Sequence, residues 1–290
     1  MISATFVDPS RATAPNGTFP GSSSRTLLTA IYYPARGTPG DKPVANAPVD
    51  TSHGPYPLVL FSHGVLARGV FYEGVLKQWA SAGYVVAAPD YPLSNTNAPG
   101  GVTFGGGVSD VKNQPADASF VISQVLKLDK TEHLVGGTVD QTRVGASGHS
   151  LGGITTYGLV FSACCSDRRI KAAVPMSGFA GIVDRADRYF GGLKVPLLTL
   201  HGNADPIVPY QLDIEGFARA KSPKFLVTFL GGGHISPFLG GSDPAAVALQ
   251  RATVDFWDRY LKGDNAALGQ LRADASVTGV TTLQQDPGRG

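Results

Sequence analysis

The stretch TRVGASGHSLGG, residues 142–153, decides the expected fold, because it joins a short apolar run to a small-residue turn that carries one serine. Its centre, Gly148-His149-Ser150-Leu151-Gly152, fits G-x-S-x-G, a strained strand-to-helix turn that points the serine hydroxyl out from the top of a sheet. The glycines are needed because a Cβ on either side would collide with the neighbouring strand or helix. A buried strand is predicted to end at 144–146 and a helix to follow at 151–161, which favours this interpretation over an ordinary glycine turn.

The patterning outward from this stretch predicts strands that alternate with helices. Runs of apolar or β-branched residues predict strands at 4–7, 26–33, 58–62, 84–88, 169–175, 195–200 and 225–230. Apolar residues at helical spacing predict helices at 71–82, 109–128, 210–220 and 243–261. We expect the glycine-rich segment 93–108 to be a long loop, segment 176–193 to be irregular, and the polar tail from residue 263 to be only weakly patterned.

Strands that are apolar throughout and alternate with helices indicate an α/β fold, with a mostly parallel central sheet and helices on both faces. A chain of 290 residues is compatible with one such domain, so we expect residues 1–290 to form a single domain with a core at about 26–262 and a tail at 263–290. In open sheets of this kind the ligand site lies beyond the carboxyl ends of the strands.

Composition excludes several classes of function. Charged residues make up 16% of the chain, and the net charge of +2 includes no basic block, so nucleic acid is not an expected partner. Apolar runs such as 84–88 and 195–200 are far shorter than the roughly 20 residues of a transmembrane helix. The first residues, MISATFVDPS, lack the features of a signal peptide. We therefore expect either a cytoplasmic protein or the mature form of a secreted one, and the low charge with 21 prolines favours secretion.

The two cysteines, Cys164 and Cys165, are adjacent in the sequence. Neighbouring cysteines rarely form an unstrained disulfide. We therefore expect buried, small apolar side chains at the end of a helix rather than a redox or metal site.

Ser150 needs two further residues to act as a nucleophile, because a serine hydroxyl is weakly nucleophilic at neutral pH. It requires a base that takes its proton and a carboxylate that orients the base. Asp205 follows the strand 195–200 in the phrase HGNADPIVP, and His234 follows the strand 225–230 in GGGH. The order Ser, Asp, His is that of an α/β-hydrolase. The sequence therefore predicts Ser150, Asp205 and His234 as a catalytic triad.

Other acids and histidines are less well placed for these roles. The acids that do not directly follow a buried strand are alternatives to Asp205, namely Asp184, Asp187 and Asp213. The histidines in a proline-rich loop, in a polar connection and at a strand end are His53, His133 and His201. His63 and His149 flank the predicted site within turns, and we expect them to hold these loops by side-chain hydrogen bonds.

The tetrahedral intermediate of acyl transfer needs N–H donors for its oxyanion, each worth about 3 kcal/mol. One donor is expected to be the backbone N–H of Leu151, which follows the nucleophile at a helix N-terminus. The second is expected from the loop after the strand 58–62. Val65 is the first choice there, and Leu66 is the alternative.

Four phrases, PLVLFSHG, GHSLGG, HGNADPIVP and GGGH, occur in this order, each at a predicted strand end. Together they resemble the α/β-hydrolase family over about residues 26–262. Within it the chain resembles the esterase branch that contains dienelactone-hydrolase-like proteins, the platelet-activating-factor acetylhydrolases and the bacterial cutinase-like polyester hydrolases. The resemblance implies a serine esterase, and because no large lid insertion is visible, we expect an open cleft.

The resemblance to the polyester hydrolases is incomplete. In those enzymes the strand after the nucleophile helix ends in an aromatic residue that stacks on the substrate, and Phe179 matches that place. Phe179 can equally be a buried anchor of its loop. Val65 stands where they usually carry an aromatic residue, and His149 stands where they usually carry Trp. These two residues bring the chain closer to the acetylhydrolase-like and general esterases.

The sequence therefore predicts a carboxylic-ester hydrolase that acts through an acyl-enzyme on short to medium chain esters, with a cutinase-like polyester hydrolase as the alternative. We expect Leu66, Phe179 and Ile235, together with Leu151, to line an apolar substrate pocket. No metal or organic cofactor is expected, the partner is a small or polymeric ester, and a monomer is expected.

Three other classes fit less well. A peptidase or amidase usually adds a gating domain, for which the chain has no room. A binding protein on this fold is expected to have lost a triad residue, and a haloalkane dehalogenase carries Asp in place of Ser150.

Overall fold

The protein is described here by a computed structural model that covers residues 1–38, 40–101, 103–131, 137–192 and 194–288. Within them nine strands form one sheet, and their bounds are β1 Ile2–Asp8, β2 Arg25–Tyr32, β3 Tyr56–Ser62, β4 Val85–Asp90, β5 Val139–His149, β6 Ile170–Met176, β7 Leu197–Gly202, β8 Lys224–Phe229 and β9 Thr281–Asp286. The strand order is β1-β2-β4-β3-β5-β6-β7-β8-β9. The pairs from β4 to β8 are parallel, and antiparallel pairs occur at the two ends of the sheet.

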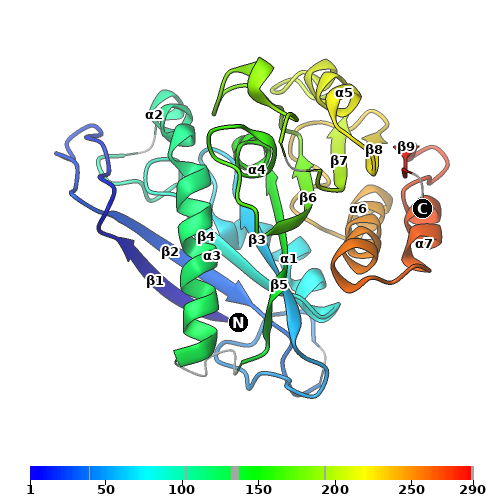
Figure 1. Cartoon of the computed structure of the whole chain (residues 1–290), viewed down its shortest axis with the longest axis horizontal. Coiled ribbons are helices and arrows are strands. Elements are labelled where there is room, and N and C mark those ends of the chain that lie inside the picture. Colours follow the sequence, from blue (N-terminus) through cyan, green and yellow to red (C-terminus); the bar gives the residue numbers. More distant parts are fainter. Residues whose placement is uncertain (39, 102, 132–136, 193, 289–290) are drawn as a thin grey trace.

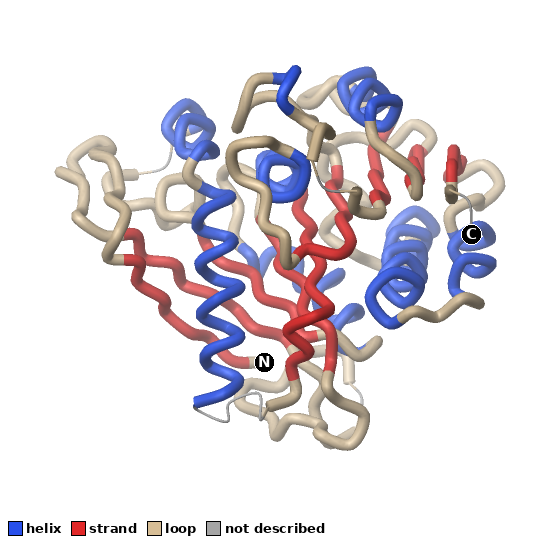
Figure 2. Tube along the Cα trace, viewed as in Figure 1, coloured by secondary structure: helices blue, strands red, loops and turns tan. Residues whose placement is uncertain are grey.

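Helices cover both faces of this sheet, as Figures 1 and 2 show. The α-helices are α1 Glu73–Ser81, α2 Phe104–Ser109, α3 Gln114–Thr131, α4 Leu151–Phe161, α5 Tyr210–Arg219, α6 Pro244–Trp257 and α7 Ala267–Asp274. Short 3₁₀ segments lie at Gly69–Tyr72, Asp110–Lys112 and Ala186–Arg188, and a π-helical turn lies at Asp258–Lys262. None of the described helices combines the length and the apolar character needed to span a membrane.

Strand β3 shows how the sequence builds a core on each face. Its side chains alternate, as the period of a strand requires. Leu58 and Leu60 pack in the core beneath α3 and α4, whereas Val59 and Phe61 pack in the core beneath α1 and α6. Both faces of this strand are therefore apolar and buried, and the predicted mostly parallel sheet with helices on both faces is confirmed.

The prediction of a long loop over residues 93–108 is wrong at its end, where helix α2 forms. Its sequence, FGGGVS, is rich in glycine and has low intrinsic helix propensity. The side chain of Thr103 caps the helix by accepting a hydrogen bond from the Gly106 N–H at 3.0 Å. Capping and packing in the fold outweigh the local preference here.

The tail is also more ordered than its weak pattern indicates, because it contains α7 and β9. Strand β9 pairs antiparallel with β8 over six residue pairs, from Thr281 opposite Phe229 to Asp286 opposite Lys224. Backbone hydrogen bonds to a neighbouring strand need no apolar sequence. Leu283 alone of the middle residues packs against the core, so the sequence TTLQQD gives little sign of a strand.

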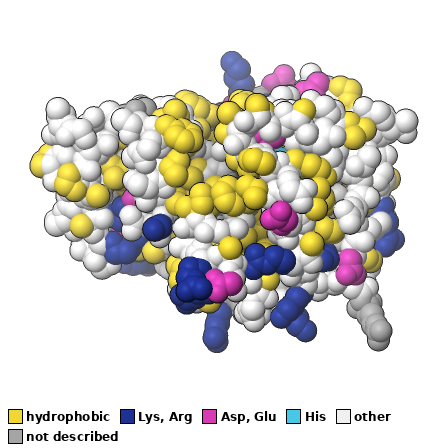
Figure 3. Space-filling model, turned by 90° about the horizontal axis from the view of Figure 1, so that it is seen from above, with side chains coloured by type: hydrophobic (Ala, Val, Ile, Leu, Met, Phe, Trp, Pro, Cys, Tyr) yellow, Lys and Arg dark blue, Asp and Glu magenta, His cyan; other side chains and the backbone are white. Residues whose placement is uncertain are grey.

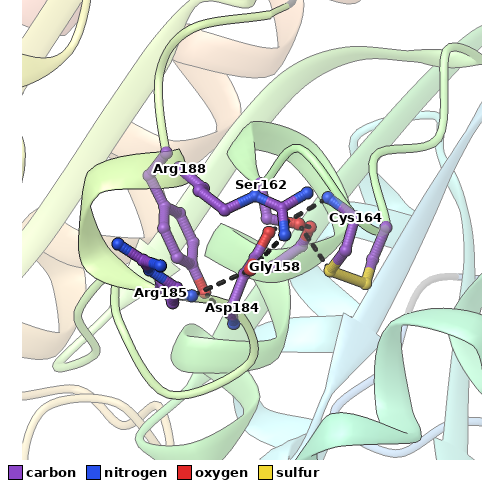
Figure 4. Close-up of a disulfide and its surroundings, with 8 residues drawn as sticks. Gly158, Ser162, Cys164, Asp184, Arg185 and Arg188 are labelled. Atoms are coloured by element: carbon purple, nitrogen blue, oxygen red, sulfur yellow. Dashed lines mark hydrogen bonds and ion pairs between the residues drawn. A yellow bond between two sulfur atoms is a disulfide. The ribbon is translucent and has the colours of Figure 1, made fainter.

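The expectation of buried cysteines is wrong. Cys164 and Cys165 form a disulfide with their Cα atoms 3.7 Å apart, and Cys164 is exposed. Helix α4 ends at Phe161 and Ser162 has extended backbone, so the pair lies on a surface turn rather than on the buried face of the helix. Figure 4 shows the surroundings, where the Cys164 N–H donates to the carboxylate of Asp184 at 3.1 Å.

Candidate active site

Ser150 lies between β5 and α4 with a backbone φ of 57° and ψ of −119°, a conformation that is strained for a residue with a side chain. The turn is so tight that a Cβ on Gly152 would lie 1.9 Å from the carbonyl oxygen of Ser62. A Cβ on Gly148 would lie 2.3 Å from the carbonyl oxygen of Gly152. Both flanking glycines are thus required for the steric reason given by the sequence.

The structure brings Ser150, His234 and Asp205 into one hydrogen-bonded line. The distance from Ser150 Oγ to His234 Nε2 is 2.8 Å, and that from His234 Nδ1 to Asp205 Oδ2 is 2.7 Å. The carboxylate can only accept, so Nδ1 carries the proton and Nε2 is free to accept from the serine hydroxyl. This is the arrangement that a serine nucleophile requires.

Asp205 is held as an anion by the loop that follows β7. Its Oδ1 accepts hydrogen bonds from the N–H groups of Ile207 at 2.8 Å and Val208 at 2.9 Å. Burial alone would raise the pKa of Asp205, but the hydrogen bonds from His234 and from these N–H groups outweigh it and lower the pKa below its ordinary value.

A second histidine lies behind Asp205. The Nε2 atom of His201 is 3.2 Å from Asp205 Oδ2, and its Nδ1 is 3.3 Å from Asp213 Oδ2. Burial would lower the pKa of His201, but the carboxylate of Asp213 beside its Nδ1 outweighs burial and raises the pKa above its ordinary value. Asp213, one of the alternative acids, therefore contacts His201 on the side away from Asp205. Its carboxylate also accepts hydrogen bonds from the hydroxyls of Thr199 and Tyr157.

The remaining alternatives lie away from Ser150. Asp184 contacts Cys164 and Arg188, and Asp187 pairs with Arg185 on the surface. His53 is exposed and pairs with Asp50. His133 lies outside the described residues.

The loop after β3 is arranged to present the Val65 N–H. The Leu66 N–H donates to the carbonyl of Ser94 at 2.8 Å, so it is already engaged, whereas the Val65 N–H donates to no acceptor among the described residues. His63 Nδ1 donates to the Gly64 carbonyl at 2.7 Å, which fixes the peptide plane that carries the Val65 N–H. Leu151 is the first residue of α4, where N–H groups have no partner inside the helix.

Ser150 opens into a cavity of about 600 Å³. Leu66, Phe179 and Ile235, the predicted pocket residues, all line it. Phe179 is half-buried and also packs against a small apolar cluster that includes Leu151, so the structure combines the two roles considered for it.

Sequence reasoning missed several apolar residues of this cavity, namely Phe71, Phe104, Ile154, Ile182, Ile207 and Leu239. Phe104 and Ile207 are each 60% exposed, Ile235 is 55% exposed and Phe71 is 50% exposed. Figure 3 shows hydrophobic side chains gathered across the upper side of the molecule, where α2 lies. The cavity thus has an exposed apolar rim (Leu66, Phe71, Phe104, Ile207, Ile235 and Leu239). Leu66 and Ile235 were predicted from the sequence, and of the missed residues only Ile207 had a sequence signal, its place two residues after Asp205.

Comparison with known proteins gives three findings. The family model of the chlorophyllases matches residues 30–189. Chlorophyllase-1 of Arabidopsis thaliana is 26% identical over 173 residues, which cover 53% of this chain and 49% of that protein. A probable 1-alkyl-2-acetylglycerophosphocholine esterase of Arthroderma benhamiae is 31% identical over 160 residues, which cover 50% of this chain and 36% of that protein. The chain thus matches half or less of the length of these relatives.

A solved structure shows the fold more completely. The ferulic acid esterase from Streptomyces cinnamoneus has a TM-score of 0.69 at 22% identity, and the match covers 91% of this chain and 90% of that one. The sheet described above is therefore that of an α/β-hydrolase. The family match on residues 30–189 includes Ser150, Val65 and Leu151, whereas Asp205 and His234 lie beyond it.

Proposed function

The chain belongs to the chlorophyllase family, within the α/β-hydrolase fold, and we propose from this that it is a serine carboxylic-ester hydrolase. The observation that carries the proposal is the hydrogen-bonded line Ser150–His234–Asp205 at an apolar cavity. The relative from Arthroderma benhamiae is itself named as a probable esterase, which supports the same class of reaction.

In the first half of the reaction, Ser150 Oγ attacks the ester carbonyl carbon while His234 Nε2 takes the serine proton. The carbonyl oxygen becomes an oxyanion and accepts hydrogen bonds from the N–H groups of Val65 and Leu151. The carbon–oxygen bond to the alcohol then breaks, and His234 gives its proton to the departing alkoxide. The products are a free alcohol and an acyl group on Ser150.

In the second half, a water molecule takes the place of the alcohol. His234 removes one proton from the water as its oxygen attacks the acyl carbon, and the same two N–H groups hold the second oxyanion. The bond to Ser150 Oγ breaks and the proton returns to the serine. Asp205 stays ionised throughout and holds the imidazolium in place, in keeping with its lowered pKa.

The cavity favours uncharged esters with short to medium chains. Its described lining contains no Lys, Arg, Asp or Glu side chain. A charged group placed there would lose water without gaining a partner, at a cost of several kcal/mol. An acyl or alkyl chain instead buries apolar surface at about 25 cal/mol per Å².

A polyester hydrolase of the cutinase type is the second candidate, and the exposed apolar rim favours it. Large apolar side chains around the mouth of a site are suited to contact with a water-insoluble surface. Such a contact would place single chains of a polymer within reach of Ser150.

The test is hydrolysis of p-nitrophenyl esters from C2 to C12 by the wild type and by Ser150→Ala, with Ser162→Ala as the control because Ser162 lies at the far end of α4. We expect the wild type to cleave C2 to C8 esters best, Ser150→Ala to lose at least about 10³-fold in kcat, and Ser162→Ala to keep its activity. Weight loss of an aliphatic-aromatic polyester film decides between the two candidates. Full activity in Ser150→Ala would contradict both.

A further inference from the structure

We propose that Tyr72 and His149 are positioning residues that join the loop of the oxyanion donor to the loop of His234 through one hydrogen-bonded bridge. This inference rests on the proposed ester hydrolysis and deepens it. The two loops follow strands β3 and β8, which are separated in the sheet by three other strands. The catalytic geometry nevertheless requires them to keep a fixed distance on either side of Ser150.

Three contacts make up the bridge. The Gly64 N–H lies 3.2 Å from the Tyr72 hydroxyl, and this hydroxyl lies 2.8 Å from His149 Nδ1. On its other side, His149 Nε2 lies 2.6 Å from the carbonyl oxygen of His234. One end of the bridge is therefore the residue before Val65, and the other end is the backbone of the general base itself.

The chemistry of the end groups fixes the direction of every bond. The His234 carbonyl can only accept, so His149 Nε2 carries the proton and donates. Burial and the nearby His234 lower the pKa of His149 to about 3, so the ring is neutral and its Nδ1 accepts. The Tyr72 hydroxyl then donates to Nδ1 and accepts from the Gly64 N–H. Each donor of the bridge therefore faces one acceptor, and this is the only placement of the protons that satisfies all three contacts.

Burial makes the bridge rigid. Tyr72 is 2% exposed and His149 is 1% exposed. The His149 ring stacks on Phe238 with a centroid distance of 4.9 Å, and the Tyr72 ring packs on Phe61 at 4.7 Å. For side chains this buried, loss of one hydrogen bond leaves a polar group without a partner and lets the backbone move.

The bridge passes directly beside the nucleophile. His149 precedes Ser150 in the chain, and a Cβ on Gly64 would lie 3.1 Å from the Tyr72 hydroxyl and 3.2 Å from Ser150 Cβ. A shift of one loop relative to the other changes the distance from Ser150 to His234 or to the Val65 N–H. Catalysis depends more steeply on these distances than substrate binding does, since a displacement of about 1 Å can cost 10²-fold in rate.

The test compares Tyr72→Phe with Tyr84→Phe in the full chain. Tyr84 is a fully buried tyrosine whose hydroxyl donates one hydrogen bond, to Asp258 at 2.5 Å, and it lines no part of the cavity. We expect Tyr72→Phe to lower kcat for p-nitrophenyl butyrate about 10- to 100-fold with KM changed less than about threefold. Tyr84→Phe is expected to keep both constants near those of the wild type.

A second measurement distinguishes the loss of catalytic positioning from a general loosening of the structure. A phenylboronic acid forms a tetrahedral adduct with Ser150 Oγ, and this adduct uses the oxyanion donors as the transition state does. We therefore expect the affinity for the boronic acid to weaken in Tyr72→Phe by about the same factor as kcat falls, whereas KM changes less. If Tyr72→Phe does not fold, His149→Phe replaces it, because a Phe ring can keep the stacking on Phe238 but has neither the donor to the His234 carbonyl nor the acceptor for Tyr72.

Each outcome bears on the inference. Wild-type kcat and boronate affinity in the variant, or an equal loss in Tyr84→Phe, would overturn the bridge while ester hydrolysis by the wild type still stands. A wild type that cleaves no ester and binds no boronate would overturn the proposed function first, and the bridge with it.

Discussion

Asp255 on helix α6 is a buried acid with an unusual environment. It is 8% exposed, and its Oδ2 has no hydrogen-bond partner among the described residues. Burial, followed by the charge of Asp274 on α7, raises the pKa of Asp255 to about 7. The folded protein therefore keeps this proton at pH values where the unfolded chain has already released it.

This shift makes the stability of the protein depend on pH. The folded state binds more protons than the unfolded state between about pH 4 and pH 7, so the free energy of unfolding falls as the pH rises through this range. Asp255→Asn removes the titrating group. We expect it to raise the free energy of unfolding at pH 8 by up to about 4 kcal/mol, at 1.36 kcal/mol per pKa unit, and to change it little at pH 4.

Urea unfolding of the wild type and Asp255→Asn at pH 4, 6 and 8 measures this difference. Asp264→Asn is the control, because Asp264 is an exposed acid near the same helices. A difference between wild type and Asp255→Asn that is the same at all three pH values would show that the carboxyl group does not titrate in this range.

Among the elements, strand β9 closes the sheet on the side of His234, the proposed general base. It covers the outer edge of β8, and β8 leads into the loop that carries His234. Deletion of residues 279–290 would leave the backbone groups of β8 unpaired. The six residue pairs correspond to about one hydrogen bond each, so at about 0.5 to 1 kcal/mol per lost bond we expect the free energy of unfolding to fall by about 3 to 6 kcal/mol, and the exposed edge to promote aggregation.

Deletion of residues 287–290 alone is the control, because it leaves β9 whole. Size-exclusion chromatography and thermal unfolding of both truncated chains make the comparison. Equal stability and equal solubility of the two would mean that β9 is dispensable for the sheet.

The elements that sequence reasoning missed share a physical cause. The turn at Ser150 could be predicted, because its two glycines and its apolar strand are dictated locally. Helix α2 depends on a cap at Thr103 and on packing around the cavity, and β9 depends on the free edge of β8. Neither condition is visible in the segment itself. The disulfide was missed because α4 ends at Phe161, so that the turn after it carries Cys164 to the surface and leaves Cys165 only half-buried.

In the molecule as a whole, the site also has one part that the sequence predicts and one part that only the folded chain reveals. The predicted residues Ser150, Asp205 and His234 meet because each follows its own strand of a parallel sheet, and such ends lie along one edge. The apolar rim is assembled from segments with no common pattern. Phe104 comes from α2 and Phe71 from the 3₁₀ turn before α1, so only the folded chain brings them to one cavity.

The rim is expected to set the preference for chain length. Phe104→Ala removes apolar surface at the mouth while the triad stays in place. We expect kcat/KM for a C8 p-nitrophenyl ester to fall about tenfold, which corresponds to about 1.4 kcal/mol of lost contact, and that for a C2 ester to change less than twofold.

Leu28→Ala serves as the control, because Leu28 is also an exposed apolar residue but does not line the cavity. Kinetics over the ester series for both variants provide the comparison. An equal loss on C2 and C8 would place Phe104 outside the path of the substrate chain.

The backbone of Ser150 has a consequence for how this protein can change. Its positive φ costs a residue with a side chain about 1 to 3 kcal/mol, and glycine would avoid most of that cost. Random libraries screened only for heat resistance will therefore enrich glycine at this position and lose the proposed nucleophile. Directed evolution of a more durable variant has to select for turnover in every round.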